Sequence, residues 1–326
     1  MKYAVSLNKE KSHNLRVLWS QYGTLVILVC MVVVMGILSP KIFLRPANLL
    51  QVVLQSTITM VVGCGEFFAI MIGGIDLSVG STLALSGMVT AKLMVSGINV
   101  FVAILLGLIL GASLGLLNGV MVTRTGLHPF IITLGTQSIY RGLTLVISGA
   151  RPVYGFPSAF SALVGGRMWS IPVPVIIAVV YAIILSIMLK KFTFGRNLYA
   201  IGGNTLTAWY SGIHVHRHKV AVFILSGFSA ALAGIIMNVR VGSAEPTAGV
   251  GYETYAIAAV IIGGASFFGG KGTIFGVMFG SLIIGVINNG LNLLNVSTHY
   301  QQIVMGMLII IAVTLDKLVA GNKGKV

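Results

Sequence analysis

Two carboxylates inside apolar sequence are the groups of this chain best placed to do chemistry. Glu66 and Asp76 belong to a set of only six acidic residues in a chain of 326. A buried acid at membrane depth costs a few kcal/mol, so it is expected where it pairs, lines a pathway or carries a proton. Asp76 has a second interpretation, in which it caps a helix that begins at Leu77. Glu66 has no comparable capping position.

Polar side chains in other apolar segments extend this set. Amides and hydroxyls can donate and accept hydrogen bonds, as recognition of a neutral polar cargo requires. The same groups can instead tie two membrane helices together. With the two acids, they make up the expected lining of a translocation pathway: Glu66, Asp76, Ser78, Asn118, Asn288, Asn289 and Asn292.

Motifs for other chemistries are incomplete. Residues 264–273 resemble a phosphate-binding loop, but Ala265 and Gly272 stand where that loop needs Gly and Ser or Thr. His214, His216 and His218 alternate in a basic segment without a nearby carboxylate, which disfavours a metal site. No Gly-x-Ser-x-Gly elbow lies in a strand–turn–helix context. We therefore expect no catalytic residue, cofactor or metal, and any ATP must be hydrolysed by another chain.

The elements that position these residues must be membrane helices. Hydrophobic residues make up 56% of the chain and charged residues 8%, against roughly 25% charged in soluble domains. The mean hydropathy is +1.00. The net charge of +15 lies at the ends of apolar segments, which is typical of topology signals and disfavours nucleic-acid binding.

The hydropathy pattern predicts an all-α protein with about ten transmembrane helices, since each needs about 20 apolar residues. The third is expected to be interrupted between Gly73 and Gly80. The charge pattern then predicts a cytoplasmic tail (1–18), a polytopic transmembrane domain (19–316) and a second cytoplasmic tail (317–326). The predicted spans are 19–38, 48–65, 66–95, 98–122, 129–148, 171–190, 219–239, 253–268, 273–294 and 300–316.

The two halves of the chain share short patterns. Residues 114–119 resemble residues 284–290, and a glycine pair precedes each. Because the matched segments run in opposite directions across the predicted spans, we expect an inverted internal repeat with the pathway near the interface of the halves. Glycines four residues apart, at 107–119 and 272–280, are expected to pack helices closely.

The longest predicted cytoplasmic connection is residues 191–218. Asn204 or Thr205 can begin a short helix in it, and Gly212 can end that helix. A short amphipathic helix between two spans suits docking onto another protein. The alternative is a helix at the lipid interface, anchored by Trp209 and Tyr210.

Several motifs then carry a family resemblance over about residues 40–316. They are Gly74–Ser81, the Gly195–Ile213 loop, Pro246–Gly249 with Gly251–Glu253, Gly269–Thr273 and Asn288–Leu294. Together they resemble the permease subunit of bacterial monosaccharide ABC importers of the ribose, xylose and galactose type. One departure is Glu66, whose position is usually uncharged in that family.

The resemblance implies that residues 19–316 are a permease domain in the lipid bilayer of a bacterial inner membrane. It also implies a monosaccharide cargo, allose or a ribose-like sugar, that is imported through a homodimer of permease chains. A separate ATPase subunit would power transport, and a periplasmic sugar-binding protein would deliver the cargo. Residues implied to couple the chain to the ATPase are Gly195, Arg196, Gly202, Asn204, Ala208, Ser211 and Gly212. The alternative function is an ion-coupled secondary sugar transporter in which Glu66 or Asp76 carries a proton.

Overall fold

The structure is a computed structural model that describes residues 23–321, and most of these are helical. A helix at Gly23–Leu38 comes first. It is followed by α2 (Pro46–Met71), α3 (Val79–Val95), α4 (Val100–Thr125), α5 (Pro129–Ser148), α6 (Ser158–Gly165), α7 (Val173–Lys191), α8 (Thr193–Gly203), α9 (Thr205–Tyr210), α10 (Val215–Val241), α11 (Tyr252–Ile262), α12 (Ile274–Leu293) and α13 (Thr298–Gly321). A small hairpin, β1 (Arg167–Met168) with β2 (Ile171–Pro172), lies between α6 and α7.

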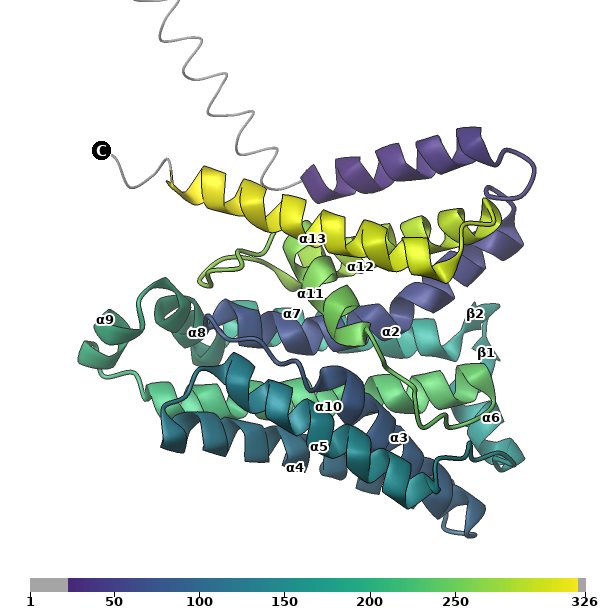
Figure 1. The fold of residues 1–326 in the computed structure, drawn as a ribbon, viewed down its shortest axis with the longest axis horizontal. Coiled ribbons are helices and arrows are strands. Elements are labelled where there is room, and N and C mark those ends of the chain that lie inside the picture. The colour runs from purple at the N-terminus through teal and green to yellow at the C-terminus, as the bar shows by residue number, and fades with distance from the viewer. Residues whose placement is uncertain (1–22, 322–326) are drawn as a thin grey trace, which may run out of the picture.

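The long helices run side by side along the long axis of the molecule (Figure 1). Helices α8 and α9 lie at one end, hereafter the α9 end, and α6 with the β1–β2 hairpin lies at the other, the hairpin end. Within residues 23–321, six helices are long and apolar enough to cross a membrane: α2, α4, α5, α7, α10 and α12. The Gly23–Leu38 helix, α3, α11 and residues 299–314 of α13 are shorter and also apolar. The expected all-α membrane architecture is confirmed.

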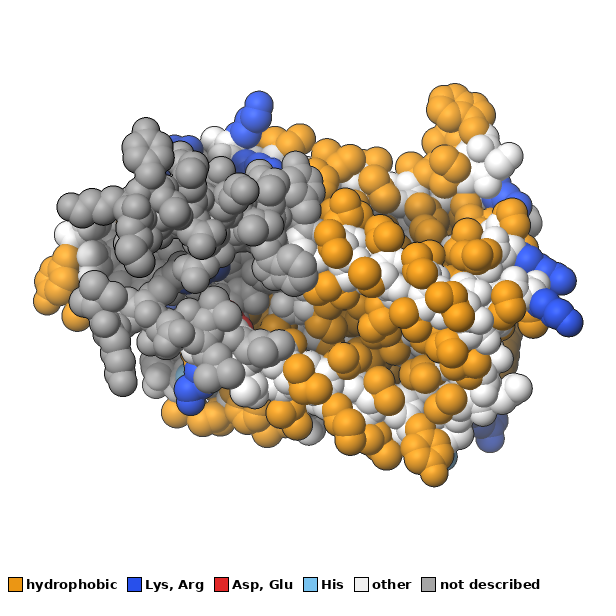
Figure 2. Space-filling view, turned by 90° about the horizontal axis from the view of Figure 1, so that it is seen from above, with side chains coloured by type: hydrophobic (Ala, Val, Ile, Leu, Met, Phe, Trp, Pro, Cys, Tyr) orange, Lys and Arg blue, Asp and Glu red, His pale blue; other side chains and the backbone are white. Residues whose placement is uncertain are grey.

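The protein surface carries the apolar side chains that a bilayer requires. Figure 2 shows the face of the molecule on which α13 lies. Hydrophobic side chains cover the described part of this face, and Lys and Arg gather toward its edge. Ile37, Val146 and Ile310 are examples of aliphatic side chains that are more than two-thirds exposed. Such exposure is costly in water and neutral in lipid, so these faces are lipid-facing or covered by another membrane chain.

Two predicted span boundaries were wrong. Helix α2 continues without a break to Met71, so the boundary expected at 65/66 does not exist. The chain breaks instead at residues 72–78, where Gly73 takes a left-handed conformation (φ 74°) that a helix cannot continue through. Helix α11 ends at Ile262 rather than near 268, because Gly264 is also left-handed (φ 87°).

The glycines at four-residue spacing bring helices close together, as predicted. A Cβ atom at Gly111 would lie 2.6 Å from the carbonyl oxygen of Gly227, and a Cβ at Gly115 would overlap the carbonyl of Phe223. These contacts seat α4 directly on the backbone of α10. Helices in lipid are not driven together by the hydrophobic effect, so their association depends on close packing. Glycines have no side chain, and this lets the backbones of two helices come into contact.

Helix packing has an internal symmetry. Helix α10 packs on α3 and α4 as α2 packs on α11 and α12, and the pairs α3–α4 and α3–α5 correspond to α11–α12 and α11–α13. Exchanging α2–α5 with α10–α13 therefore leaves this set of contacts unchanged. Such symmetry is what two similar halves would produce, and duplication of the chain stays a prediction.

Candidate functional site

The break between α2 and α3 holds a buried cluster of polar groups. The Glu66 Oε1 atom accepts a hydrogen bond from the Asp76 N–H at 3.0 Å. Asp76 Oδ1 accepts from the backbone N–H of Ser78 at 3.0 Å and from its hydroxyl at 2.6 Å, and Asp76 Oδ2 accepts from the Ser226 hydroxyl at 2.7 Å. All four residues are buried. Both Asp76 oxygens are thus paired, and the carboxylate holds the broken segment against α10.

Asp76 accepts a backbone hydrogen bond near the start of a helix, as expected, but the helix starts later in the chain than predicted. Helix α3 begins at Val79, not Leu77, and its N-cap residue is Ser78. Asp76 accepts the N–H of that N-cap residue, which makes a turn of the kind that Asp side chains form with the backbone two residues on. The carboxylate therefore orders the entry to α3 rather than its first helical turn.

Hydrogen bonds extend the cluster to α4 and α5. The Asn118 amide donates to the Ser78 hydroxyl oxygen at 2.8 Å, and the Tyr140 hydroxyl donates to Asn118 Oδ1 at 3.2 Å. We call the connected residues the inner polar network: Glu66, Asp76, Ser78, Asn118, Tyr140 and Ser226. Four of the seven expected pathway residues meet here. Tyr140 and Ser226 were missed, because nothing in the neighbouring sequence sets either apart from the other polar residues of its helix, and only the fold shows its partner.

Residues 242–251 fold inward and meet the start of α3. A Cβ atom at Gly80 would overlap the carbonyl of Gly249 and lie 2.6 Å from Glu253 Oε2. The Arg141 guanidinium donates to the carbonyls of Pro246 at 2.8 Å and Ala248 at 2.7 Å. This segment is therefore packed against α3 and α5. The N-termini of α3 and α11 meet there, with Glu253 in the first turn of α11.

The three asparagines of α12 do not join the inner polar network. Asn289 exchanges two hydrogen bonds with Asn48, at 2.9 and 3.0 Å, which ties α12 to α2. Asn292 accepts from the Gln301 amide at 2.7 Å. Asn288 and Asn292 line a cavity of about 270 Å³. We call it the outer cavity; its other polar lining residues are Gln55, Thr59, Arg240, Tyr252, Tyr255 and Gln301.

The connection between α7 and α10 contains two short helices. The expected helix is confirmed as α9: the Asn204 side chain accepts the Thr207 N–H at 2.9 Å, and Gly212 follows the helix end with a φ of 82°. Helix α8 was not expected, and its N-cap residue is Phe192, whose side chain has no group that can cap a helix. In the described segment, the His218 ring bonds the Asn197 side chain at 3.1 Å and the His214 carbonyl at 2.9 Å, so it orders the junction with α10.

The expected coupling residues have two different environments. Arg196, Asn204, Ser211 and Gly212 are exposed, whereas Gly195 and Ala208 are buried. A Cβ atom at Gly202 would overlap the Met71 carbonyl and lie 2.9 Å from the Gly270 Cα atom. Gly195, Gly202 and Ala208 therefore seat the segment on the membrane helices. The exposed apolar side chains of α9 are Leu206, Trp209 and Tyr210.

The contact of α8 with Met71 and residues 270–272, which we call the α8 seat, joins three parts of the chain. The Gly270 N–H donates to the Met71 carbonyl at 2.9 Å, and the Tyr199 hydroxyl donates to the Gly272 carbonyl at 2.7 Å. Burial raises the pKa of Tyr199, so its hydroxyl keeps the proton that it donates. Movement of α8 would thus act on the end of α2, directly before the break that holds Asp76.

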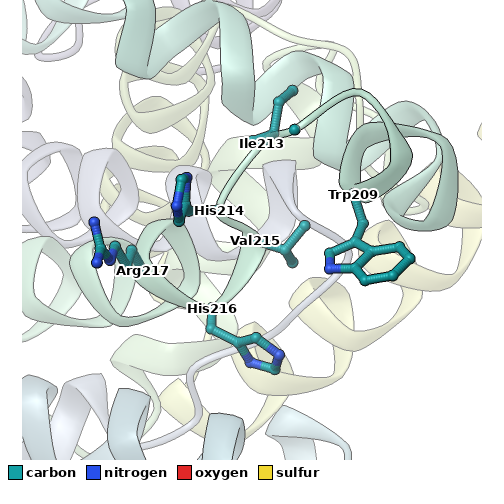
Figure 3. Close-up of a pocket in the computed structure, with 7 residues that line it drawn as sticks. Trp209, Ile213, His214, Val215, His216 and Arg217 are labelled. Atoms are coloured by element: carbon teal, nitrogen blue, oxygen red, sulfur yellow. The ribbon is translucent and has the colours of Figure 1, made fainter.

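A groove of about 430 Å³ separates α9 from the start of α10. Its lining includes Trp209 and Val215, whose side chains face one another across the gap, while Arg217 lies on the far side of Val215 from Trp209 (Figure 3). An apolar groove beside exposed aromatic side chains and basic residues has the character of a protein-docking surface.

Comparison with known proteins identifies the family. Residues 48–313 match the family described as branched-chain amino acid transport system / permease component. The chain is 54% identical to the D-allose transport system permease protein AlsC of Escherichia coli (strain K12) over 314 residues, 96% of each chain. It is 46% identical to the ribose import permease protein RbsC of Bacillus subtilis (strain 168) over 297 residues, 90% of this chain and 92% of that one.

A third relative, the L-arabinose transport system permease protein AraH of Escherichia coli (strain K12), is 37% identical over 300 residues, 92% of this chain and 91% of that one. No solved structure matches the chain. The chain therefore belongs to the permease family of bacterial monosaccharide ABC importers, as a multi-pass inner-membrane protein. The resemblance seen in its motifs is confirmed.

Proposed function

We propose that this chain is the membrane subunit of an importer that carries D-allose, or a closely related aldose such as ribose, into the cell. Support comes from the higher identity to the allose permease, 54%, than to the ribose permease, 46%, over nearly the whole chain. A periplasmic binding protein delivers the sugar at the hairpin end. Two copies of the chain enclose the path, and both termini and α9 face the cytoplasm.

The structural observation that supports an ATP-driven importer is the arrangement of side chains at the α9 end. The exposed Leu206, Trp209 and Tyr210 lie beside an open groove, and α8 sits by backbone contact on the end of α2. We propose that a separate ATPase subunit docks on this surface. ATP-driven movement of α8 and α9 then displaces the end of α2 and the inner polar network, and this opens or closes the path.

The test is sugar uptake by reconstituted protein. The chain is placed in proteoliposomes with its ATPase, ATP inside and the sugar-binding protein outside, and uptake of labelled D-allose, D-ribose and L-arabinose is compared. We expect uptake to require all three additions and to be fastest for allose. Uptake by this chain alone, without ATP and abolished by a protonophore, would contradict the proposal and favour the ion-coupled alternative.

A further inference from the structure

The outer cavity has a lining that suits a small neutral ligand with many hydroxyl groups. It lies between α2, α10, α11, α12 and α13, and only Ile284 and Gly285 of its lining residues lack a polar side-chain group. Its volume of about 270 Å³ is just below the range of roughly 300–1,000 Å³ for pockets of drug-sized ligands. A single monosaccharide is a ligand of that smaller size.

Two residues that line the cavity have a side-chain oxygen that accepts no hydrogen bond from the described residues. Asn288 Oδ1 is buried and has no hydrogen-bond partner among the described residues. A buried acceptor left unpaired costs about 1–3 kcal/mol, so a donor from a ligand or from water is expected there. The Gln301 amide uses its N–H groups on Asn292 and on the Val296 carbonyl, at 2.7 and 3.1 Å. Only the carbonyl oxygen of Gln301 is left for a ligand.

Donors and aromatic rings complete the lining. Arg240 and Gln55 can donate, and the hydroxyls of Thr59, Tyr252 and Tyr255 can donate or accept. The rings of Tyr252 and Tyr255 pack edge to face, with 5.7 Å between their centroids. Mixed donors and acceptors match hydroxyl groups, which do both, better than they match an anion or a cation. The rings offer apolar surface to the C–H groups of a sugar.

The position of the cavity fits a step in transport. Helix α12 begins near the α8 seat, so Asn288 and Asn292, in its last turns, lie toward the hairpin end. Glu253, in the first turn of α11, accepts from Gln137, and Tyr252 precedes it directly on the cavity wall. The cavity therefore lies next to the place where the N-termini of α3 and α11 meet.

We propose that the outer cavity is a sugar-binding site within each permease chain, occupied by an aldose after the binding protein releases it. This inference rests on the proposed function. It assigns to the permease itself a part in sugar selection, with Asn288, Gln301, Gln55 and Tyr255 as direct contacts.

The test is sugar binding to the permease–ATPase complex in lipid nanodiscs, without the binding protein, by saturation-transfer NMR with D-allose as the probe. Loss of one neutral hydrogen bond weakens binding by between about threefold and tenfold. We expect losses of that size in Gln55→Leu, Asn288→Leu and Tyr255→Phe. Gln51→Leu is the matched control, because Gln51 is exposed one helical turn before Gln55 and does not line the cavity.

Folding and function are read in the same samples. Asn288→Leu removes an unpaired buried acceptor, so we expect its thermal unfolding to be unchanged or higher. Equal binding by the wild type and all three cavity variants would overturn the inference. So would the absence of a signal in a wild-type complex that imports allose, which would leave only water in the cavity while the proposed function stands. A wild-type complex that imports no monosaccharide would overturn both.

Discussion

At the scale of single residues, Asp76 and Glu66 have different surroundings. Both oxygens of Asp76 accept hydrogen bonds, from Ser78 and Ser226. Glu66 uses only Oε1, on the Asp76 N–H, and its buried Oε2 has no partner among the described residues. These contacts suit a positioning role for Asp76. At Glu66 a single acceptor oxygen is enough for the observed hydrogen bond, and the second oxygen takes no part in it.

Glu66→Gln separates the two functions considered for this chain. The amide keeps an oxygen that can accept the Asp76 N–H, so in the ATP-driven importer we expect uptake within about twofold of the wild type. A proton carrier would lose transport, because an amide does not titrate. The measurement is ATP-dependent allose uptake in proteoliposomes.

Glu66→Met is the companion variant. It removes the acceptor as well as the charge and leaves the Asp76 N–H unpaired in a buried site. We expect a loss of stability of about 1–3 kcal/mol, measured by thermal unfolding in detergent. Unfolding that is identical in Glu66→Gln and Glu66→Met would show that the Asp76 hydrogen bond does not stabilise the break.

At the scale of elements, the decisive feature is the contact between α8 and α2. Both ends of the contact are glycine-rich, and their backbones approach too closely for a Cβ atom at Gly202. From the sequence, Gly202 and Ala208 were expected to belong to a docking surface. The structure places Gly202 against the end of α2 and buries Ala208, so we expect substitutions there to act on the seat of the segment, and coupling to an ATPase stays a prediction.

Adjacent glycines at the end of α8 allow a controlled experiment. A side chain at Gly202 would overlap the Met71 carbonyl, whereas Gly203 is exposed and a Cβ atom there would have no neighbour within 4 Å. We expect Gly202→Val to reduce ATP-dependent uptake at least about tenfold, because overpacking of this size costs roughly 1–3 kcal/mol and displaces α8. Gly203→Val should retain uptake.

ATPase binding shows where the effect arises. We expect the ATPase subunit to co-purify with both variants, since neither changes the exposed side chains of α9. Equal uptake by Gly202→Val and Gly203→Val would mean that the contact with Met71 does not transmit movement.

At the scale of the whole molecule, the orientation in the membrane follows from the position of α9. If α9 binds an ATPase, it faces the cytoplasm, and the β1–β2 hairpin with the exposed Trp169 faces outward. The two natural cysteines, Cys30 and Cys64, can be replaced to give a background for labelling.

Single cysteines test this orientation. In cells carrying a variant without Cys30 and Cys64, we expect Trp169→Cys to react with a membrane-impermeant maleimide. Leu206→Cys, which lies on exposed α9, should react only after the membrane is permeabilised. Reaction of Leu206→Cys in intact cells would reverse the topology, and with it the side on which the ATPase is placed.

The sequence alone determined the class of this protein. Long apolar segments with basic ends can only be satisfied in a bilayer, and the backbone hydrogen bonds of such segments require helices. The short helix after Asn204 and the close packing of the α4 glycines were also predictable, because both depend on interactions within one helix or on the absence of a side chain. The family followed from several motifs in a fixed order.

Only the tertiary structure decided which polar residues act together. Ser226 lies 150 positions from Asp76, and no local pattern marks it as the partner of that carboxylate. The pathway residues expected as one set were divided between the inner polar network, the Asn48–Asn289 pair and the outer cavity. The physical reason is that a polar group in lipid must pair with whichever helix the packing brings beside it, and backbone contacts between distant glycines set that packing.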